Sequence, residues 1–561
     1  MTAPAARAKC LMMVSLVFLC AMLLVVPVMG QEMPYDRVAD AYPKNEHINI
    51  LHYTFAISLE DNSESIEVVA TIDARYTAGG QNELRLDLIG ASDAAPDKGM
   101  EVASVTWADG PLKFAHRDDQ VFIDLGREIE AGELIRVAVK YQGVPAKGLI
   151  VGPNKHGDFT FFSDNWSSRA RHWLATVDHP YDKATSAFVV TAPNHLQVVS
   201  NGLLVEETDL PEGKRLTHWH NSVPISTWLF ALGAAEFAVQ YVDTFEGKSI
   251  QTWVYRQDRD AGFYDFAVPT KQSLAFFSDL IGPFVYEKLA NIQSNSVGGG
   301  MEAASSVFYG DNSVTGNRDK RWQHVIIHEI AHQWFGNAVT EYDWNHLWLS
   351  EGFATFYTLV FREYAYGKDD FIAGLRDARE RVIAYYEKDY DFQIIRDELP
   401  DLDKVSGSMI YQKGAWTLHM LREMMGRDTY NAGVRAYYAE FINSTAHTAD
   451  FRRHMEEVSG LDLRQFLGQW LYQGGIPSLN GSWLYSDGKL RIQIAQVQDN
   501  YAFELPVEFE IVYADGSTDQ TILQSTGDGA IMYDRMVDKP VANVIIDPEV
   551  RLLAKWKFGQ R

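Results

Sequence analysis

Cysteine is nearly absent from this sequence. The 561 residues include two cysteines, Cys10 and Cys20, and both lie in one apolar segment near the start. Downstream of that segment the chain has no thiol, which excludes disulfide bonds, thiolate metal ligands and a cysteine nucleophile. We therefore expect reducing agents not to destabilise the folded protein.

Positive charge is also scarce. The chain has 50 lysines and arginines against 75 aspartates and glutamates, a formal net charge of -25 at pH 7. Binding to nucleic acid needs a basic face that neutralises phosphates, so this composition argues against a nucleic-acid partner. We expect no obligate membrane partner either, and nothing in the sequence indicates an oligomeric state.

One long apolar run is present, from Cys10 to Val28. Arg7 and Lys9 precede it, and small and then polar residues follow Val28. This order predicts a secretory signal over residues 1–30, removed from an exported protein that is periplasmic or secreted. Because the run has 19 residues, it is just long enough to span a bilayer, and an uncleaved N-terminal anchor facing outside the cytoplasm is the alternative.

The hydrophobic periodicity divides the rest of the chain into three regions. Residues from about 45 to 240 alternate with period two, as Ile66, Val68, Ala70 and Ile72 illustrate, and predict a largely antiparallel β domain. From about 260 to 475 the spacing becomes helical, and alternation returns after Pro477. We expect an α+β multidomain protein with domains at residues 31–240, 241–475 and 476–561.

The helical region contains the motif His328-Glu329-Ile330-Ala331-His332. Histidines four residues apart lie on one face of a helix, so both imidazoles can bind one metal ion. Catalytic zinc needs three protein ligands and an open position, and Glu351, 18 residues after His332, is the natural third. We expect one zinc per chain, with Glu329 as the general base toward water.

The surrounding residues resemble a known family. His328 to Asn337 and Trp348 to Ala354 are similar to the zinc aminopeptidases of the aminopeptidase N and leukotriene A4 hydrolase type. Two further segments agree with the order of motifs in that family, Gly298-Gly299-Gly300-Met301-Glu302 upstream and Tyr411-Gln412-Lys413-Gly414-Ala415 downstream.

The resemblance implies both a fold and a function. It implies a saddle-shaped antiparallel β domain, a thermolysin-like α-rich catalytic domain and a small C-terminal β-sandwich. It also implies an aminopeptidase that removes N-terminal residues from peptides by attack of metal-activated water. Glu302 would bind the free α-ammonium, Tyr411 would stabilise the oxyanion, and the neighbouring backbone of Gly299, Gly300 and Met301 would hold the substrate.

The sequence departs from the family at several positions. Ala303 replaces the usual asparagine after Glu302, and Asp164 is the nearest substitute for a second amine-binding acid. His346 stands where relatives carry aspartate, and it could be an indirect partner of the metal site, an extra ligand or a core histidine. Because about 85 residues follow Pro477, we also expect the large helical C-terminal domain of many relatives to be absent and the site to be more open.

Two other functions compete with the aminopeptidase. One is a different zinc-dependent hydrolysis on the same scaffold, such as epoxide opening or endopeptidase cleavage. The other is a non-catalytic binding module, which predicts a broken metal site, whereas His328, Glu329, His332 and Glu351 are all present.

Overall fold

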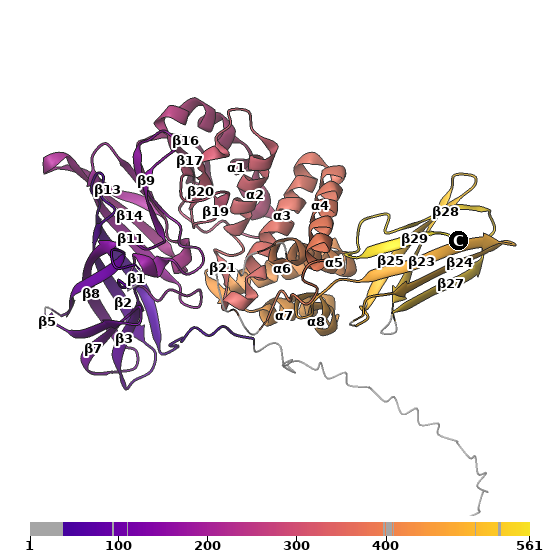
Figure 1. Cartoon of the computed structure of the whole chain (residues 1–561), viewed down its shortest axis with the longest axis horizontal. Helices are drawn as coiled ribbons and strands as arrows, with labels where there is room; N and C mark the ends of the chain where they lie inside the picture. The colour runs from indigo at the N-terminus through magenta and orange to yellow at the C-terminus, as the bar shows by residue number, and fades with distance from the viewer. Residues whose placement is uncertain are drawn as a thin grey trace, which may run out of the picture. The chain divides into compact units, whose positions relative to one another are not determined.

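The structure is a computed structural model. It describes residues 38–92, 95–108, 110–396, 399, 407, 409–499, 501–525 and 529–561. The predicted signal segment, residues 1–30, lies outside these residues. Along the described chain, strands come first, helices follow and strands return, as Figure 1 shows. None of the described helices is long and apolar enough to cross a membrane.

The N-terminal region is built on an eight-stranded sheet. Its strands, in spatial order, are β13 (Leu203–Leu210), β14 (Lys214–Ile225), β11 (Ala184–Pro193), β1 (Ile48–Ser58), β2 (Ile66–Tyr76), β8 (Leu134–Val144), β4 (Gly99–Trp107) and β5 (Gly110–Pro111). All pairings are antiparallel except that of β1 with β11. Alternate residues of β2 are buried, with Ile66, Ala70 and Ile72 at 0% exposure, so the predicted antiparallel β region is confirmed.

Two smaller sheets complete this region. The first has the order β12 (Gln197–Ser200), β15 (Leu232–Ala235), β10 (Phe159–Ser163) and β9 (Leu149–Pro153). The second has the order β3 (Gln81–Asp87), β7 (Gln120–Ile129) and β6 (Lys113–Arg117).

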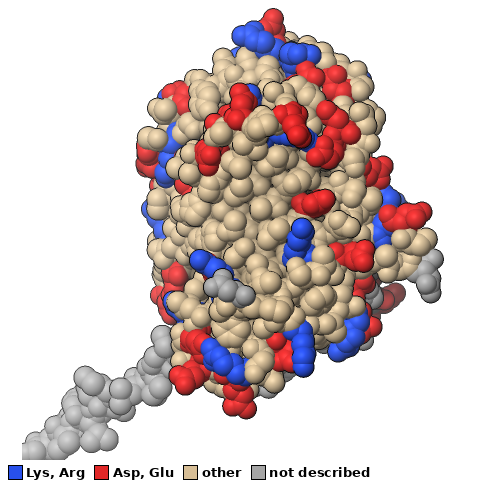
Figure 2. All heavy atoms as spheres, turned by 90° about the vertical axis from the view of Figure 1, so that its left-hand side faces the viewer, with Lys and Arg blue, Asp and Glu red and all other residues tan. Residues whose placement is uncertain are grey.

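On the face drawn in Figure 2, the visible Lys and Arg side chains are interspersed with acidic ones and do not merge into one broad basic area.

A five-stranded mixed sheet follows the N-terminal β region and precedes most of the helices in the chain. Its order is β16 (Phe237–Phe245), β17 (Lys248–Tyr255), β18 (Lys288–Ser294), β20 (Ser306–Gly310) and β19 (Gly300–Met301). Strands β18 and β20 lie inside the region whose periodicity predicts helices. Every residue of both strands is buried, so neither shows the alternation that would reveal a strand.

Within the described residues, eight α-helices follow or flank this sheet. They are α1 (Arg259–Leu280), α2 (Lys320–His332), α3 (Trp348–Tyr366), α4 (Lys368–Tyr386), α5 (Gly414–Met425), α6 (Arg427–Phe441), α7 (Thr448–Ser459) and α8 (Arg464–Leu471). A π-helical turn, η9 (Met409–Lys413), leads into α5, and two short strands, β21 (Val339–Glu341) and β22 (Ser444–Ala446), pair in parallel. The helical periodicity therefore predicts this region correctly outside the buried strands.

The C-terminal region consists of two antiparallel-rich sheets. One has the order β27 (Ala530–Met536), β24 (Lys489–Gln496), β23 (Ser478–Ser486) and β29 (Lys555–Gln560). The other has the order β26 (Thr518–Ser525), β25 (Leu505–Tyr513) and β28 (Val541–Ile546). Asp-Gly turns at Asp487 and Asp515 connect β23 to β24 and β25 to β26.

Candidate metal centre

Helix α2 carries the His-Glu-x-x-His motif in its last turn and a half. Its N-terminus is capped by Asp319, whose side chain accepts hydrogen bonds from the backbone N–H of Arg321 and Trp322 at 3.0 and 3.4 Å. Apolar residues such as Ile326 and Ile330 are buried and fix the rotation of the helix. His328 and His332 consequently project from one face.

Three predicted ligands converge at this face. The Nε2 atoms of His328 and His332 lie 3.1 Å apart, and Glu351 Oε2 lies 3.4 and 3.1 Å from them. Ligand atoms about 2.0–2.1 Å from a tetrahedral zinc ion are about 3.3 Å apart. Glu351 Oε2 is buried and has no hydrogen-bond partner within the described chain. The three residues therefore fit a zinc ion.

The ring of His332 is held in the orientation that ligation needs. Its Nδ1 lies 3.1 Å from the carbonyl oxygen of Phe335 and 3.2 Å from the hydroxyl of Ser350. Because a carbonyl can only accept, Nδ1 carries a proton, and Nε2 is the ring nitrogen left to bind a metal. A sharp turn follows the helix at Gly336, whose φ of 106° disfavours any side chain.

The centre holds more negative than positive groups. Three buried carboxylates, those of Glu302, Glu329 and Glu351, surround two imidazoles. Burial raises the pKa of Glu302 to about 7. Burial lowers the pKa of His332, but the carboxylates of Glu302 and Glu351 outweigh this and raise it to about 10. A divalent cation would neutralise this surplus, which is a second reason why the donor set fits a metal.

The carboxylates of Glu329 and Glu302 lie within 4.8 Å of each other beside the short strand β19. A Cβ atom on Gly300 would lie 2.1 Å from Glu329 Oε1, so only glycine lets the strand pass this close to the carboxylate. Glu302 follows the strand, and its Oε1 is buried without a hydrogen bond among the described residues. The carboxylate reaches to 4.0 Å from His332 Nε2, so its position is beside the three ligands.

Two side chains that we did not predict hold the Glu302 segment against α2. Gln333 and Asn337 donate from their amide nitrogens to the carbonyl oxygen of Glu302 at 3.2 and 2.6 Å. Both belong to the segment His328 to Asn337 that carries the resemblance. The position of Gln333 and Asn337 shortly after His332 indicates that they lie near the metal centre, but the sequence does not reveal which group they contact.

Tyr411 reaches the centre from η9. Its hydroxyl donates a hydrogen bond to Glu351 Oε1 at 2.7 Å, and its ring is stacked with that of His328 at 6.0 Å between centroids. The nearby Lys413 is buried and donates to the hydroxyl of Tyr386 and to two backbone carbonyls, which anchors this turn. The structure thus brings Tyr411 to the predicted ligands from 60 residues beyond Glu351.

Asp164 and His346, whose roles the sequence leaves open, do not join the three predicted ligands. Asp164 forms an ion pair with Arg169 at 2.8 Å, so its charge is already partly compensated. His346 is buried, with Nδ1 at 2.8 Å from the hydroxyl of Thr448 and Nε2 at 3.3 Å from the carbonyl oxygen of Val38. Of the three roles considered for His346, the structure supports that of a core histidine.

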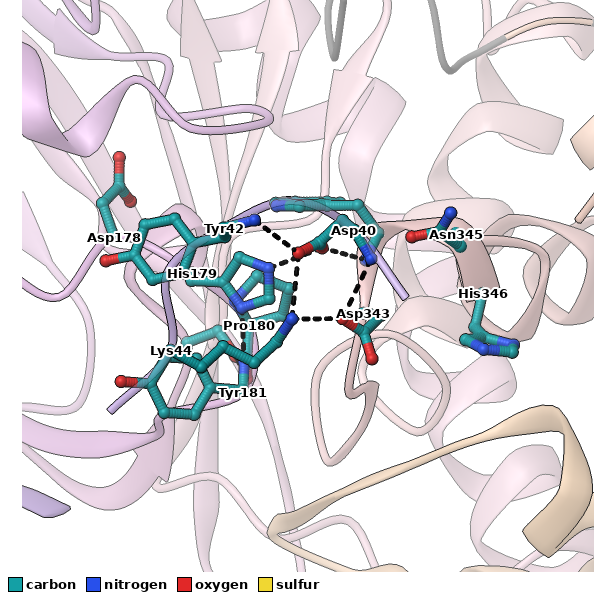
Figure 3. Close-up of polar contacts among 12 residues, drawn as sticks. Asp40, Tyr42, Lys44, Asp178, His179, Pro180, Tyr181, Asp343, Asn345 and His346 are labelled. Atoms are coloured by element: carbon teal, nitrogen blue, oxygen red, sulfur yellow. Dashed lines mark hydrogen bonds and ion pairs between the residues drawn. The ribbon is translucent and has the colours of Figure 1, made fainter. Parts of the chain in front are cut away.

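A second group of acids and histidine lies beside His346, as Figure 3 shows. Asp40, His179 and Asp343 have ligand-type atoms close enough to share a cation. The ammonium of Lys44, however, lies 2.9 Å from Asp40 Oδ1 and 2.5 Å from Asp343 Oδ1. His179 Nε2 donates to Asp40 Oδ2 at 2.7 Å, and its Nδ1 accepts from the backbone N–H of Tyr181. The Lys44 ammonium thus takes the place that a metal ion would have between the two carboxylates.

Comparison with known proteins supports the predicted family. The domain described as "Peptidase family M1 domain" matches residues 268–470, and "Peptidase M1 N-terminal domain" matches residues 51–229. Together the two matches include α2, α3, η9 and the eight-stranded sheet's strands from β1 to β14.

Among curated proteins, the chain is similar to glutamyl aminopeptidase of Sus scrofa, with 27% identity over 57% of this chain and 35% of that protein. It is 26% identical to aminopeptidase M1 of Arabidopsis thaliana, over 58% of this chain and 38% of that protein. A probable aminopeptidase 2 of Sulfurisphaera tokodaii is 24% identical over 77% of this chain and 55% of that protein. The chain thus spans about a third to a half of the length of these relatives.

Among solved structures, the M1 zinc metallopeptidase of Deinococcus radiodurans has a similar fold. Its TM-score is 0.65 at 21% identity, over 76% of this chain and 93% of that chain. The ordered motifs, the two matching domains and this fold lead to one conclusion: the chain belongs to peptidase family M1.

Proposed function

We propose that the protein is a zinc-dependent aminopeptidase. The observation that carries the proposal is the buried Glu302 carboxylate, whose Oε1 has no hydrogen bond among the described residues and lies 4.0 Å from the ligand nitrogen of His332. A carboxylate at this position can bind the α-ammonium that an exopeptidase substrate carries beside its first peptide bond and that an endopeptidase substrate lacks there. His328, His332 and Glu351 would hold the zinc.

Glu329 and Tyr411 would move and stabilise charge during peptide hydrolysis. A bound zinc ion supplies Lewis-acid polarisation and lowers the pKa of water. The Glu329 carboxylate accepts the proton that water loses and passes it to the leaving amine. Burial raises the pKa of Glu329 well above its ordinary value, which makes its carboxylate a stronger proton acceptor. The Tyr411 hydroxyl donates to the oxyanion.

The strand before Glu302 would bind the substrate backbone. Strand β19 is the last strand of the five-stranded sheet, and Gly299, Gly300 and Met301 form or precede it. An edge strand leaves backbone N–H and C=O groups free to pair with an extended peptide. The peptide's first residue would then lie near Glu302, with its first peptide bond toward the three ligands.

The experiment compares substrates with free and acetylated amines. Acetylation removes the charge and hydrogen-bond donors that Glu302 would bind, a contact worth about 1.5 to 3 kcal/mol, or roughly 10- to 150-fold in kcat/KM. We expect fluorogenic aminoacyl substrates to be cleaved faster than their acetylated forms, and Glu302→Ala to shrink this preference without changing zinc content. Asp164→Ala is the matched control and should leave the preference intact.

Each other result has a definite meaning. Equal cleavage of free and acetylated substrates by the unmodified protein would identify an endopeptidase or another hydrolase. A protein that binds zinc and cleaves neither substrate would support the non-catalytic module. If Asp164→Ala, and not Glu302→Ala, removed the preference, Asp164 would be the amine-binding acid.

The proposal extends to domain organisation and location. We propose domains at residues 31–240, 241–475 and 476–561, with residues 1–30 as a signal for export. The charge order around Arg7, Lys9 and the apolar run supports export. Mass spectrometry of the exported protein should find an N-terminus at or near Gln31, and recovery of residues 10–28 in a membrane fraction would establish the anchor instead.

A further inference from the structure

A second cavity lies among helices of the catalytic region, apart from the metal centre. It has a volume of about 270 Å³ and is lined by residues of α1, α3, α5 and α6. Phe276 and Leu280 of α1 and Val360 of α3 form an apolar wall. Val360 lies nine residues beyond Glu351 on the same helix, about 13 Å along its axis. The cavity is therefore not part of the centre described above.

The cavity is also lined by a buried arginine, Arg422, with no hydrogen bond from its Nε within the described residues. Arg422 of α5 is 3% exposed, and its guanidinium lies over the rings of Phe356 and Phe371 at 5.2 and 5.1 Å. The nearest carboxylate oxygens are 3.7 and 3.8 Å away, too far for hydrogen bonds. Burying a cation this way is costly unless an anion accepts from it.

The two nearby carboxylates already have closer cations. Glu363 forms an ion pair of 2.8 Å with Arg427, and Glu423 forms one of 2.8 Å with Arg551. Arg551 also pairs with Glu508 at 3.2 Å. Arg427 and Arg551 therefore each have a carboxylate within hydrogen-bond distance, and Arg422 has none among the described residues. Arg422 faces a cavity rather than solvent, which strengthens its attraction for an anion.

A hydroxyl group extends the polar wall. Tyr430 of α6 lines the cavity and is 1% exposed, and its hydroxyl lies near that of Tyr357 without a hydrogen bond of normal geometry. A phenolic hydroxyl can donate to an oxygen of an anion. The lining of the cavity thus combines a buried guanidinium and a phenolic hydroxyl with apolar side chains.

We propose that this cavity binds a small organic carboxylate. The carboxylate would accept hydrogen bonds from Arg422 and Tyr430, and its apolar body would pack against Phe276, Leu280 and Val360. The volume suits one small molecule and is too small for a folded partner. An inorganic anion would satisfy Arg422 but would leave the apolar wall without a contact.

The test is a calorimetric titration of the zinc-loaded protein with 4-methylpentanoate. Acetate, which lacks the apolar body, 4-methylpentanamide, which lacks the charge, and chloride are titrated in parallel. We expect saturable binding of 4-methylpentanoate to one site per chain, weaker binding of the other three, and a 10- to 150-fold weaker Kd for Arg422→Met, as expected for a lost charge-assisted hydrogen bond. Arg321→Met, on the exposed start of α2, is the matched control and should bind normally.

A second variant keeps the proposal testable if Arg422→Met does not fold. Val360→Trp fills the apolar half of the cavity without removing a polar group, and it should abolish binding while zinc content and circular dichroism stay unchanged. Binding that survives Val360→Trp would place the carboxylate elsewhere, the metal centre included, and would overturn the proposal. Equal affinity for chloride and 4-methylpentanoate would also overturn the proposal. The same holds if 4-methylpentanoate shows no saturable binding up to about 50 mM, well above the millimolar Kd of a weak ligand.

Discussion

Two groups of histidine and carboxylate in this protein have similar chemistry and opposite outcomes. In one, the open group, His328, His332 and Glu351 approach one another, and no lysine or arginine of the described chain forms an ion pair with Glu351. In the other, the closed group, Asp40, His179 and Asp343 also have ligand-type atoms within 4.8 Å of one another, but the Lys44 ammonium lies between the two carboxylates. The difference teaches that ligand-type residues at metal-site spacing are insufficient: the site must also lack an internal cation.

The largest effect is expected when the open group loses a ligand. Glu351→Ala removes one of three ligands, so the protein should lose its zinc and all measurable peptidase activity. Asp343→Asn, the corresponding change in the closed group, should leave zinc content unchanged because Lys44 and not a metal contacts that carboxylate. Metal analysis and peptidase assays on the two variants measure the contrast.

A smaller loss is expected when the open group keeps its metal but loses its base. Glu329→Gln preserves shape and removes proton transfer, which should lower kcat by about 100- to 10,000-fold with zinc retained. The assay is steady-state kinetics together with metal content. Near-normal turnover of this variant would mean that Glu329 does not move the proton.

Tyr411→Phe tests the neighbouring donor. The hydroxyl hydrogen-bonds Glu351 in the described structure, and its removal should lower kcat about 100- to 1,000-fold if it stabilises the oxyanion. Zinc content should be unaffected, since two histidines and Glu351 remain. A variant that loses zinc in proportion to activity would instead show that Tyr411 acts by positioning Glu351.

Lys44→Met is the change that would convert the closed group toward the open one. Removing the ammonium leaves two carboxylates facing each other, which should lower the free energy of unfolding by about 2 kcal/mol, less than for a fully buried pair because Lys44 keeps some exposure. Added zinc or cobalt should restore part of this stability by binding at Asp40, His179 and Asp343. Lys44→Arg is the control that keeps the charge; a Lys44→Met variant indifferent to added metal would refute the comparison.

Acid should weaken the closed group. Burial would raise the pKa of Asp40, but His179 and Lys44 lower it well below its usual value. A carboxyl whose folded pKa is lowered stabilises the protein above its unfolded pKa of about 3.9, and this contribution is lost as pH falls below that value. The test is denaturant unfolding between about pH 5 and 3 in a zinc-free Glu351→Ala background. Over this range the free energy of unfolding should fall by about 1 kcal/mol less when Lys44→Met is added than when Lys44 is retained. Parallel pH curves would contradict this role for Asp40.

The contrast also explains what could be predicted from the sequence. The ligands of the open group lie on two helices within 24 residues, so helical spacing and the motif identified them. The closed group joins residues 40, 44, 179 and 343, and no local pattern connects positions so far apart. Likewise, alternation revealed β2, which has one buried face, but not β18 and β20, which are buried on both faces.

Glu302, the residue proposed to bind the amine, marks the limit of prediction at the centre itself. The run Gly298 to Glu302 was recognised from its order relative to the motif, yet the contacts from Gln333 and Asn337 that hold it in place depend on tertiary structure. Arg422 is a stronger example, because an arginine in a helix is ordinarily exposed, and only packing shows that this one is buried beside a cavity.

The most direct test of the central claim is the zinc content of three purified proteins, measured by mass spectrometry of metals alongside protein concentration. We expect one zinc per chain in the unmodified protein, none in Glu351→Ala and one in Asp343→Asn. Zinc retained by Glu351→Ala, or lost from Asp343→Asn, would contradict the assignment of the open group as the metal centre.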